Sequence, residues 1–174
     1  METVLQHLRN RHLDVDLHRP IIDEEERVAT FYLWNLSSQL VGYQQYRPDQ
    51  PSKQKKNDPK SGRYFTYRKQ PTLGVWGIES LHLSPNVLFI TEGVFDAARI
   101  TERGYSALAV LSNDPRPELR NWLSFLNRKV VAICDNDKAG KRLAKFGDVA
   151  VFTDGKDLGD ADDDFVTELL NNYG

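Results

Sequence analysis

The sequence contains a single cysteine, Cys134, among its 174 residues. One cysteine excludes an internal disulfide and a zinc ribbon within this chain, and it is consistent with a reducing compartment. Long apolar runs are also missing, since the longest, at residues 87–90 and 130–133, have the length of strands rather than of membrane spans. The first residues are interrupted by charges and lack the apolar core of a secretion signal. We therefore expect a cytoplasmic protein that does not bind to membranes.

Charge is balanced in total but not along the chain, which has 23 lysines and arginines against 25 aspartates and glutamates. Residues 41–70 hold eight basic side chains against two aspartates, whereas residues 154–164 hold six aspartates against one lysine. A basic segment and an acidic segment in one small chain suggest an anionic ligand held near a bound cation. The alternative is that both segments are solvated loops.

The first half of the sequence predicts a small antiparallel β subdomain, residues 1–84. A short helix and an irregular acidic stretch precede two strand-like segments, 28–34 and 40–47, which a polar turn joins. The polar segment 48–62, with its prolines and lysines, predicts a loop, and residues 63–69 predict another strand rich in aromatic and basic residues.

The pattern changes at residues 85–174, where apolar strands alternate with amphipathic helices. We expect strands at 86–90, 105–111, 129–134 and 148–152, and helices at 94–103, 117–129 and 139–146. This alternation is typical of parallel β-α units, so the sequence predicts a layered α/β domain.

Acidic residues follow three of these predicted strands. Glu92 comes after the first strand, Asp135 and Asp137 come after the third, and Asp157 comes after the fourth. Carboxyl ends of parallel strands meet at one edge of a sheet, and residues i and i+2 of an extended segment face the same side. Carboxylates are ligands that Mg²⁺ prefers, and a bound cation would remove their mutual repulsion. A lone Glu-Gly or Asp-x-Asp pair is more often a turn or a cap, but the joint pattern favours a metal site.

Two glycines accompany the acids. Gly93 follows Glu92, where a glycine permits a sharp turn and the close approach of a ligand. Gly140 stands near the start of the next predicted helix, whose N-terminus favours phosphate.

The segments ITEGVFDAARITERGYSALAVLSN and VVAICDNDKAGKRLAKF resemble the TOPRIM domain shared by topoisomerases, bacterial-type primases and some nucleases. The resemblance implies a Rossmann-like fold with a mostly parallel four-stranded sheet and flanking helices. It implies that Glu92 is a catalytic acid/base or metal ligand, and that Asp135 and Asp137 are catalytic residues that bind Mg²⁺ or Mn²⁺. Asp96 matches the aspartate that often follows the glutamate–glycine pair. A looser match, GKDLGDADDDF, implies that Asp157 is a supporting metal ligand.

Upstream, QLVGYQQYRP and SGRYFTYRKQPTLGVWGIES resemble the basic β subdomain of bacterial and phage primases, especially phage primase-helicases. The resemblance implies single-stranded DNA and NTPs as partners. The basic residues expected to face nucleotide or template are Arg63, Arg68, Lys69, Lys53, Lys55 and Lys56. This sequence shows neither the zinc ribbon nor the helicase portion of such primases, so a separate zinc-ribbon protein or a replicative helicase is a candidate partner.

The sequence thus predicts a primase-like nucleotidyltransferase core that makes or extends short primers on single-stranded DNA. One alternative is a TOPRIM nuclease, in which the same acids activate water. Another is a non-catalytic nucleic-acid-binding protein with a vestigial metal site. The upstream β subdomain favours the primase over the nuclease, and the intact acids argue against the non-catalytic protein.

Overall fold

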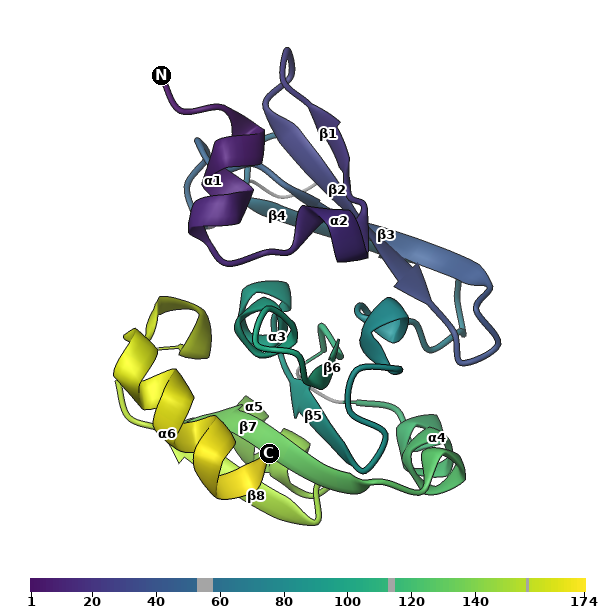
Figure 1. Cartoon of the computed structure of the whole chain (residues 1–174). Coiled ribbons are helices and arrows are strands. Elements are labelled where there is room, and N and C mark those ends of the chain that lie inside the picture. The colour runs from purple at the N-terminus through teal and green to yellow at the C-terminus, as the bar shows by residue number, and fades with distance from the viewer. Residues whose placement is uncertain (53–57, 113–114, 156) are drawn as a thin grey trace.

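Two four-stranded sheets follow one another along the chain in the computed structural model, which describes residues 1–52, 58–112, 115–155 and 157–174 (Figure 1). The first sheet is antiparallel, and its strands lie side by side in sequence order. The part of the chain that forms this sheet contains, in order, α1 (Val4–Asn10), α2 (Val15–His18), β1 (Ile21–Asp23), β2 (Val28–Trp34), β3 (Leu40–Tyr46) and β4 (Tyr64–Arg68). The predicted antiparallel subdomain is confirmed, but strand β1 replaces part of the expected irregular stretch.

Strand β1 is only three residues long, too short to show a recognisable pattern in the sequence. Ile21 and Ile22 pair with Thr30 and Ala29 of β2, and this pairing is what makes the segment a strand. Strands β2 and β3 alternate over most of their length, as expected of a sheet with one covered face. In β2, for example, Phe31 and Leu33 are buried, whereas Tyr32 and Trp34 are half-buried.

The second sheet is parallel throughout, with the strand order β6-β5-β7-β8. The part of the chain that forms this sheet contains, in order, β5 (Val87–Thr91), α3 (Val94–Thr101), β6 (Ser106–Ala109), α4 (Glu118–Leu126), β7 (Lys129–Asp135), α5 (Lys138–Ala144), β8 (Val149–Thr153) and α6 (Asp163–Tyr173). Short 3₁₀ turns, η1 (Ile78–Ser80) and η2 (Leu158–Asp160), precede β5 and α6. The predicted α/β fold class is confirmed.

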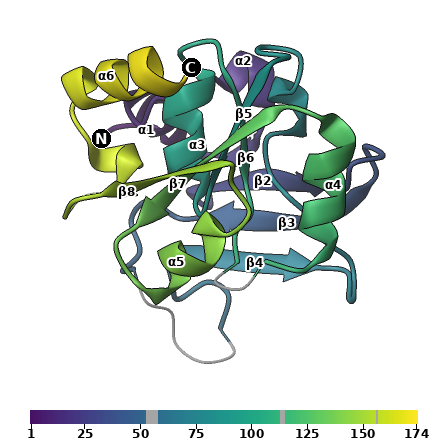
Figure 2. The ribbon, with the colours of Figure 1, turned by 90° about the horizontal axis from the view of Figure 1, so that it is seen from below.

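Helices cover both faces of the parallel sheet, with α3 and α6 on one face and α4 and α5 on the other (Figure 2). Alternate residues of β5 enter the two apolar clusters, since Phe89 packs with α3 and Ile90 packs with α4. All of β5 is therefore buried, which explains why the strand is an uninterrupted apolar run.

Helix α6 begins inside the acidic segment 154–164, for which one alternative was a solvated loop. The side chain of Asp162 caps the helix by accepting the backbone N–H of Phe165, and Asp163 and Asp164 occupy the first turn. Negative charge at a helix N-terminus is stabilising, so these aspartates serve the fold. Within the described ranges, no helix has the length and apolarity needed to cross a bilayer.

Two residues join the sheets. Val75 pairs with Trp34, the last residue of β2, and the next residue, Trp76, pairs with Ala109 of β6. The core also crosses the predicted boundary at residue 84, because Phe31 of β2 packs edge-on against Phe95 of α3, with ring centroids 5.9 Å apart. Helix α3 is thus enclosed between the two sheets (Figure 1).

Candidate active site

Residues from both sheets line a cavity of about 380 Å³ at the carboxyl edge of the parallel sheet. Such a volume is within the range of small-molecule sites. The parallel sheet contributes three of the predicted acids, Glu92, Asp135 and Asp157, and the other wall includes Arg11, Gln44 and Tyr64.

Glu92 directly follows β5 and is half-buried. Burial raises its pKa to about 6, and the charges of Asp135, Asp137 and Asp157 contribute to the rise. These four carboxyl groups are therefore close enough to repel one another. Their positions at neighbouring strand ends predicted that these acids would lie near one another, and each charge disfavours ionisation of the others.

Asp135 is the last residue of β7, and it lines the cavity together with Asp157. Burial and the charge of Asp157 raise the pKa of Asp135 to about 6. A cation bound beside the two carboxylates would offset the repulsion between them.

Asp137 is exposed, and it lies outside the cavity lining. It is the N-cap of α5, where its Oδ1 accepts the backbone N–H of Gly140 at 2.7 Å. A Cβ at Gly140 would lie 1.7 Å from the carbonyl oxygen of Asp135, so only glycine fits there. This glycine allows α5 to start directly against the end of β7, while the carboxylate of Asp137 already caps the helix.

Gly93 has φ of −106°, a conformation that any residue adopts. The position therefore does not require glycine for the sharp turn that was expected there. A Cβ there would lie 3.3 Å from Oδ2 of Asp96, so the missing side chain leaves that carboxyl accessible beside the cavity. The turn itself is held by Thr91, whose hydroxyl donates to the Gly93 carbonyl at 2.9 Å.

The donor set fits a hard divalent cation. Within the described part of the chain, no three acidic, histidine or cysteine side chains are already gathered tightly enough to enclose an ion. Mg²⁺, however, usually takes only one or two carboxylates and completes its shell with water and substrate phosphates. The Asp135–Asp157 pair, with Glu92 in the same cavity, suits that type of coordination.

The basic residues predicted to face nucleotide or template are not brought together. Arg63 is half-buried and its Nε donates to the Gln50 carbonyl, but its charge still lowers the pKa of Tyr64 against the larger effect of burial. Lys69 is exposed on the opposite face of the antiparallel sheet, beside Tyr43 and Tyr67. The predicted loop residues Lys53, Lys55 and Lys56 lie outside the described residues.

Arg68 binds protein carbonyls instead of projecting into the cavity. Its Nε donates to Gly74, and its Nη2 donates to Val110 and Leu111, both at 2.9 Å. Burial lowers the pKa of this guanidinium. Leu111, which lines the cavity, has φ of 52°, a strained conformation for a branched residue. Arg68 therefore holds a strained cavity loop in place.

The cavity residues that were not singled out as site residues from the sequence include Arg11, Gln44 and Tyr64. Arg11 follows α1, and its guanidinium lies 4.0 Å from the centroid of the Phe95 ring, while its buried Nε finds no hydrogen-bond partner among the described residues. Gln44 and Tyr64 come from the covered face of the antiparallel sheet. No local motif marks these positions, although strand alternation predicts that only one of Tyr64 and Phe65 faces this way.

Cys134 is not part of this chemistry. It is buried in β7, and burial together with the nearby acids raises the pKa of its thiol to about 11. A thiol that stays protonated is a poor nucleophile, so Cys134 serves as a small buried side chain of the sheet.

The same fold occurs in solved structures. The chain matches the zinc-binding and RNA polymerase domains of the Aquifex aeolicus primase with a TM-score of 0.61 and 20% identity, over 85% of this chain and 40% of that chain. It matches a DnaG primase catalytic domain bound to single-stranded DNA with a TM-score of 0.59 and 16% identity, over 94% and 61%. For the primase fragment of the bacteriophage T7 primase-helicase protein, the TM-score is 0.56 and the identity 10%, over 84% and 62%.

No protein-family profile and no curated protein matches the sequence. The chain spans 40% to 62% of the length of the three solved structures. At identities of 10% to 20%, the likeness concerns the fold. At that level the resemblance inferred from the sequence is confirmed: this chain has the fold of a DNA primase catalytic core.

Proposed function

We propose that this chain is a primase-like nucleotidyltransferase core that makes or extends short primers on single-stranded DNA. NTPs would be its second substrate, and Mg²⁺ or Mn²⁺ its cofactor. The observation that carries the proposal is the cavity in which acids from three strand ends, Glu92, Asp135 and Asp157, face a wall that contains Arg11. The fold supports it, since structures of primases share this architecture and one of them is bound to single-stranded DNA.

A divalent ion bound by Asp135, Asp157 and Glu92 would neutralise triphosphate charge and activate a primer 3′-hydroxyl. Glu92, with a pKa of about 6, is largely ionised at neutral pH and is suited to accept the proton of that hydroxyl. The 3′-oxygen would bond to the α-phosphorus as pyrophosphate leaves. Arg11 offers a guanidinium donor to the phosphates from the other wall.

The direct test is incubation with single-stranded DNA, labelled NTPs and Mg²⁺ or Mn²⁺, followed by a gel that resolves both extension and cleavage. We expect extension, which Glu92→Gln and Asp135→Asn should each abolish while nucleic-acid binding persists. Asp148→Asn is the matched control, because Asp148 lies at the other end of the same sheet and accepts the Val130 N–H, which asparagine can also do.

Two outcomes would replace the proposal. Cleavage without extension, lost in the Glu92→Gln variant, would indicate the metal-dependent nuclease. Binding of single-stranded DNA with neither product would indicate a non-catalytic nucleic-acid-binding protein.

A further inference from the structure

The outer face of the antiparallel sheet, which points away from the cavity, carries a row of three tyrosines. Tyr32 of β2 pairs with Tyr43 of β3, and Tyr43 pairs with Tyr67 of β4, so the row crosses three neighbouring strands. Residues directly opposite each other on paired strands share one face of a sheet. Tyr32 and Tyr43 are half-buried and Tyr67 is 51% exposed, while the ring centroids of Tyr43 and Tyr67 lie 5.5 Å apart. The fold therefore leaves a row of accessible aromatic rings, here called the tyrosine face.

Two hollows adjoin this row, and Tyr32 lines both of them. One, of about 390 Å³, contains all three tyrosines together with Lys69. The other, of about 330 Å³, contains Trp34 and Arg19 on the far side of Tyr32. The tyrosine face thus has a cation at each end and aromatic rings between the two cations.

The charges in these hollows are unbalanced. Lys69 and Arg19 are exposed, and neither makes an ion pair with a described residue. The described lining of the first hollow includes no acid, and the acid of the second, Glu79, is hydrogen-bonded to His18 at 2.6 Å. In a chain whose net charge is −2, this is a local excess of positive charge. A partner that carries negative charge is therefore complementary to the face.

Aromatic rings flanked by cations without acidic partners suit single-stranded nucleic acid. The bases of a single strand are free to stack on aromatic side chains, while its phosphates attract lysine and arginine. In a common class of RNA-binding domain, aromatic residues on the face of a four-stranded sheet stack two or three bases. A duplex offers no such contact, because its bases already stack on one another.

We propose that the tyrosine face is a second contact for single-stranded DNA, separate from the catalytic cavity. Bases stack on Tyr32, Tyr43 and Tyr67, and Lys69 and Arg19 attract the phosphates on either side. Only the identification of the strand as DNA template rests on the proposed function. Because this face and the cavity lie on opposite sides of one sheet, the contact holds template that is not being copied.

The test measures the affinity of a labelled single-stranded oligonucleotide of about 16 nucleotides by fluorescence anisotropy, without NTPs. We expect Tyr67→Ala to weaken binding by roughly 5- to 100-fold, the effect of losing one base–aromatic stack. Tyr67→Phe keeps the ring and should bind like the wild type. The matched control is Phe125→Ala, which removes an aromatic side chain that is 81% exposed on α4 and should leave the affinity unchanged.

Two further measurements separate stacking from charge and locate the contact. An abasic oligonucleotide keeps the phosphates but has no bases, so Tyr67→Ala should not weaken its binding. Iodouracil placed in the oligonucleotide should form photo-crosslinks to wild-type protein, and mass spectrometry should map them to the peptides that contain Tyr43 or Tyr67. The crosslinks do not depend on any variant, and thermal unfolding checks that each variant is folded.

Undiminished affinity in Tyr67→Ala, a loss that Tyr67→Phe shares, or crosslinks confined to cavity residues such as Tyr64 would overturn the inference. Primer extension by the same wild-type protein would then still support the proposed function. A stable dimer that Tyr67→Ala dissociates would assign the face to a second copy of the chain and also overturn the inference. Crosslinks at the tyrosines without extension would support the inference and contradict the proposed function. A wild type that binds no single-stranded DNA would contradict both.

Discussion

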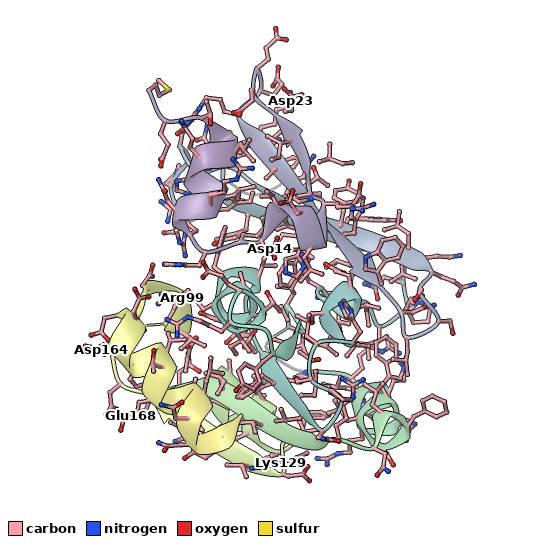
Figure 3. The ribbon with its side chains drawn as sticks, viewed as in Figure 1. Asp14, Asp23, Arg99, Lys129, Asp164 and Glu168 are labelled. Atoms are coloured by element: carbon pink, nitrogen blue, oxygen red, sulfur yellow. The ribbon has the colours of Figure 1, made fainter. Side chains whose placement is uncertain are left out.

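The carboxylate of Asp96 accepts the backbone N–H of Gly159 at 2.8 Å. Asp96 lies in the first turn of α3, and Gly159 lies two residues after the cavity acid Asp157. Arg99 of the same helix donates to the carbonyls of Gly159 and Ala161, and Figure 3 shows it between α3 and the segment that leads to α6. Helix α3 therefore positions the loop that carries Asp157.

Asp96→Ala should weaken both the fold and metal binding. Losing the acceptor leaves the Gly159 N–H unpaired, which costs about 1–3 kcal/mol of stability. A loosened Asp157 should reduce Mg²⁺ affinity by roughly 10- to 100-fold, the usual effect of removing a group that orients a ligand. Chemical denaturation and Mg²⁺ calorimetry measure the two effects. Burial raises the pKa of Asp96 to about 7, so Asp96→Asn resembles the protonated residue and should retain most of both properties. Equal losses in the two variants would contradict the positioning role.

Arg68→Ala should destabilise the protein by about 2–4 kcal/mol. The substitution leaves three carbonyl groups without their donor and frees the strained Leu111. Lys69→Ala is the neighbouring control, and its exposed side chain should change stability by less than about 0.5 kcal/mol. Urea denaturation compares them. If Arg68→Ala unfolds like the wild type but binds nucleotide poorly, Arg68 is a ligand-binding residue, as the sequence resemblance implied.

Stabilisation by Mg²⁺ should increase with pH. In the metal-free protein the pKa values of Glu92 and Asp135 are about 6, well above their ordinary values. Between about pH 4 and pH 6 the folded state then holds more protons than the unfolded state, so these acids make stability fall as pH rises. Mg²⁺ binds the ionised carboxylates and opposes that fall. We expect thermal unfolding to show almost no effect of Mg²⁺ at about pH 5 and a clear rise in Tm at about pH 8. Asp135→Asn should remove most of the rise, and a rise that is equal at both pH values would place the metal elsewhere.

Arg11→Ala should weaken ATP binding by roughly 10- to 100-fold, because a charge-assisted hydrogen bond to phosphate is lost. Arg9→Ala is the matched control, since Arg9 is exposed on α1 and does not line the cavity. Calorimetry with ATP and with adenosine separates a phosphate contact from a general effect. Equal losses for ATP and adenosine would show that Arg11 supports the cavity wall through its stacking on Phe95.

Lys69 and Arg63 test the predicted template face. Each alanine variant should lower single-stranded DNA affinity and reduce the slope of log affinity against log salt by roughly 0.7 per lost phosphate contact. Fluorescence anisotropy across a salt series measures this. Because Lys69 lies on the face opposite the cavity, its loss should leave ATP affinity unchanged. Unaltered salt slopes in both variants would mean that template does not cross this sheet.

The parallel sheet could be predicted because its signal is local. Buried strands such as β5 and β7 are unbroken apolar runs, and the acids that follow them mark the ends of the strands. Strand β1 could not be predicted because pairing alone defines it. The start of helix α6 could not be predicted, because the aspartates that cap it also make the segment look like an acidic loop.

The cavity wall opposite the acids depends on packing between distant segments. Arg11 lines the cavity only because α1 and the antiparallel sheet pack against α3, and Gln44 becomes a cavity residue only when β3 faces that helix. Charge alone did not distinguish Arg68 from a ligand-binding cation, since two of its three carbonyl partners, Val110 and Leu111, lie 42 and 43 residues further along the chain. Pairwise tertiary contacts of this kind leave no spacing in the sequence.

Val75 and Trp76 bear on how the molecule opens. Their backbone groups are hydrogen-bonded to Trp34 of one sheet and Ala109 of the other. Because Val75 and Trp76 are adjacent, opening the hydrogen bonds to one sheet should also open those to the other. The amides of Val75 and Trp76 should therefore exchange with solvent only in a global unfolding event. The antiparallel sheet and the parallel sheet, although they contribute opposite walls of the cavity, then belong to a single cooperative unit, and the spacing between the acids and Gln44 is as stable as the fold itself.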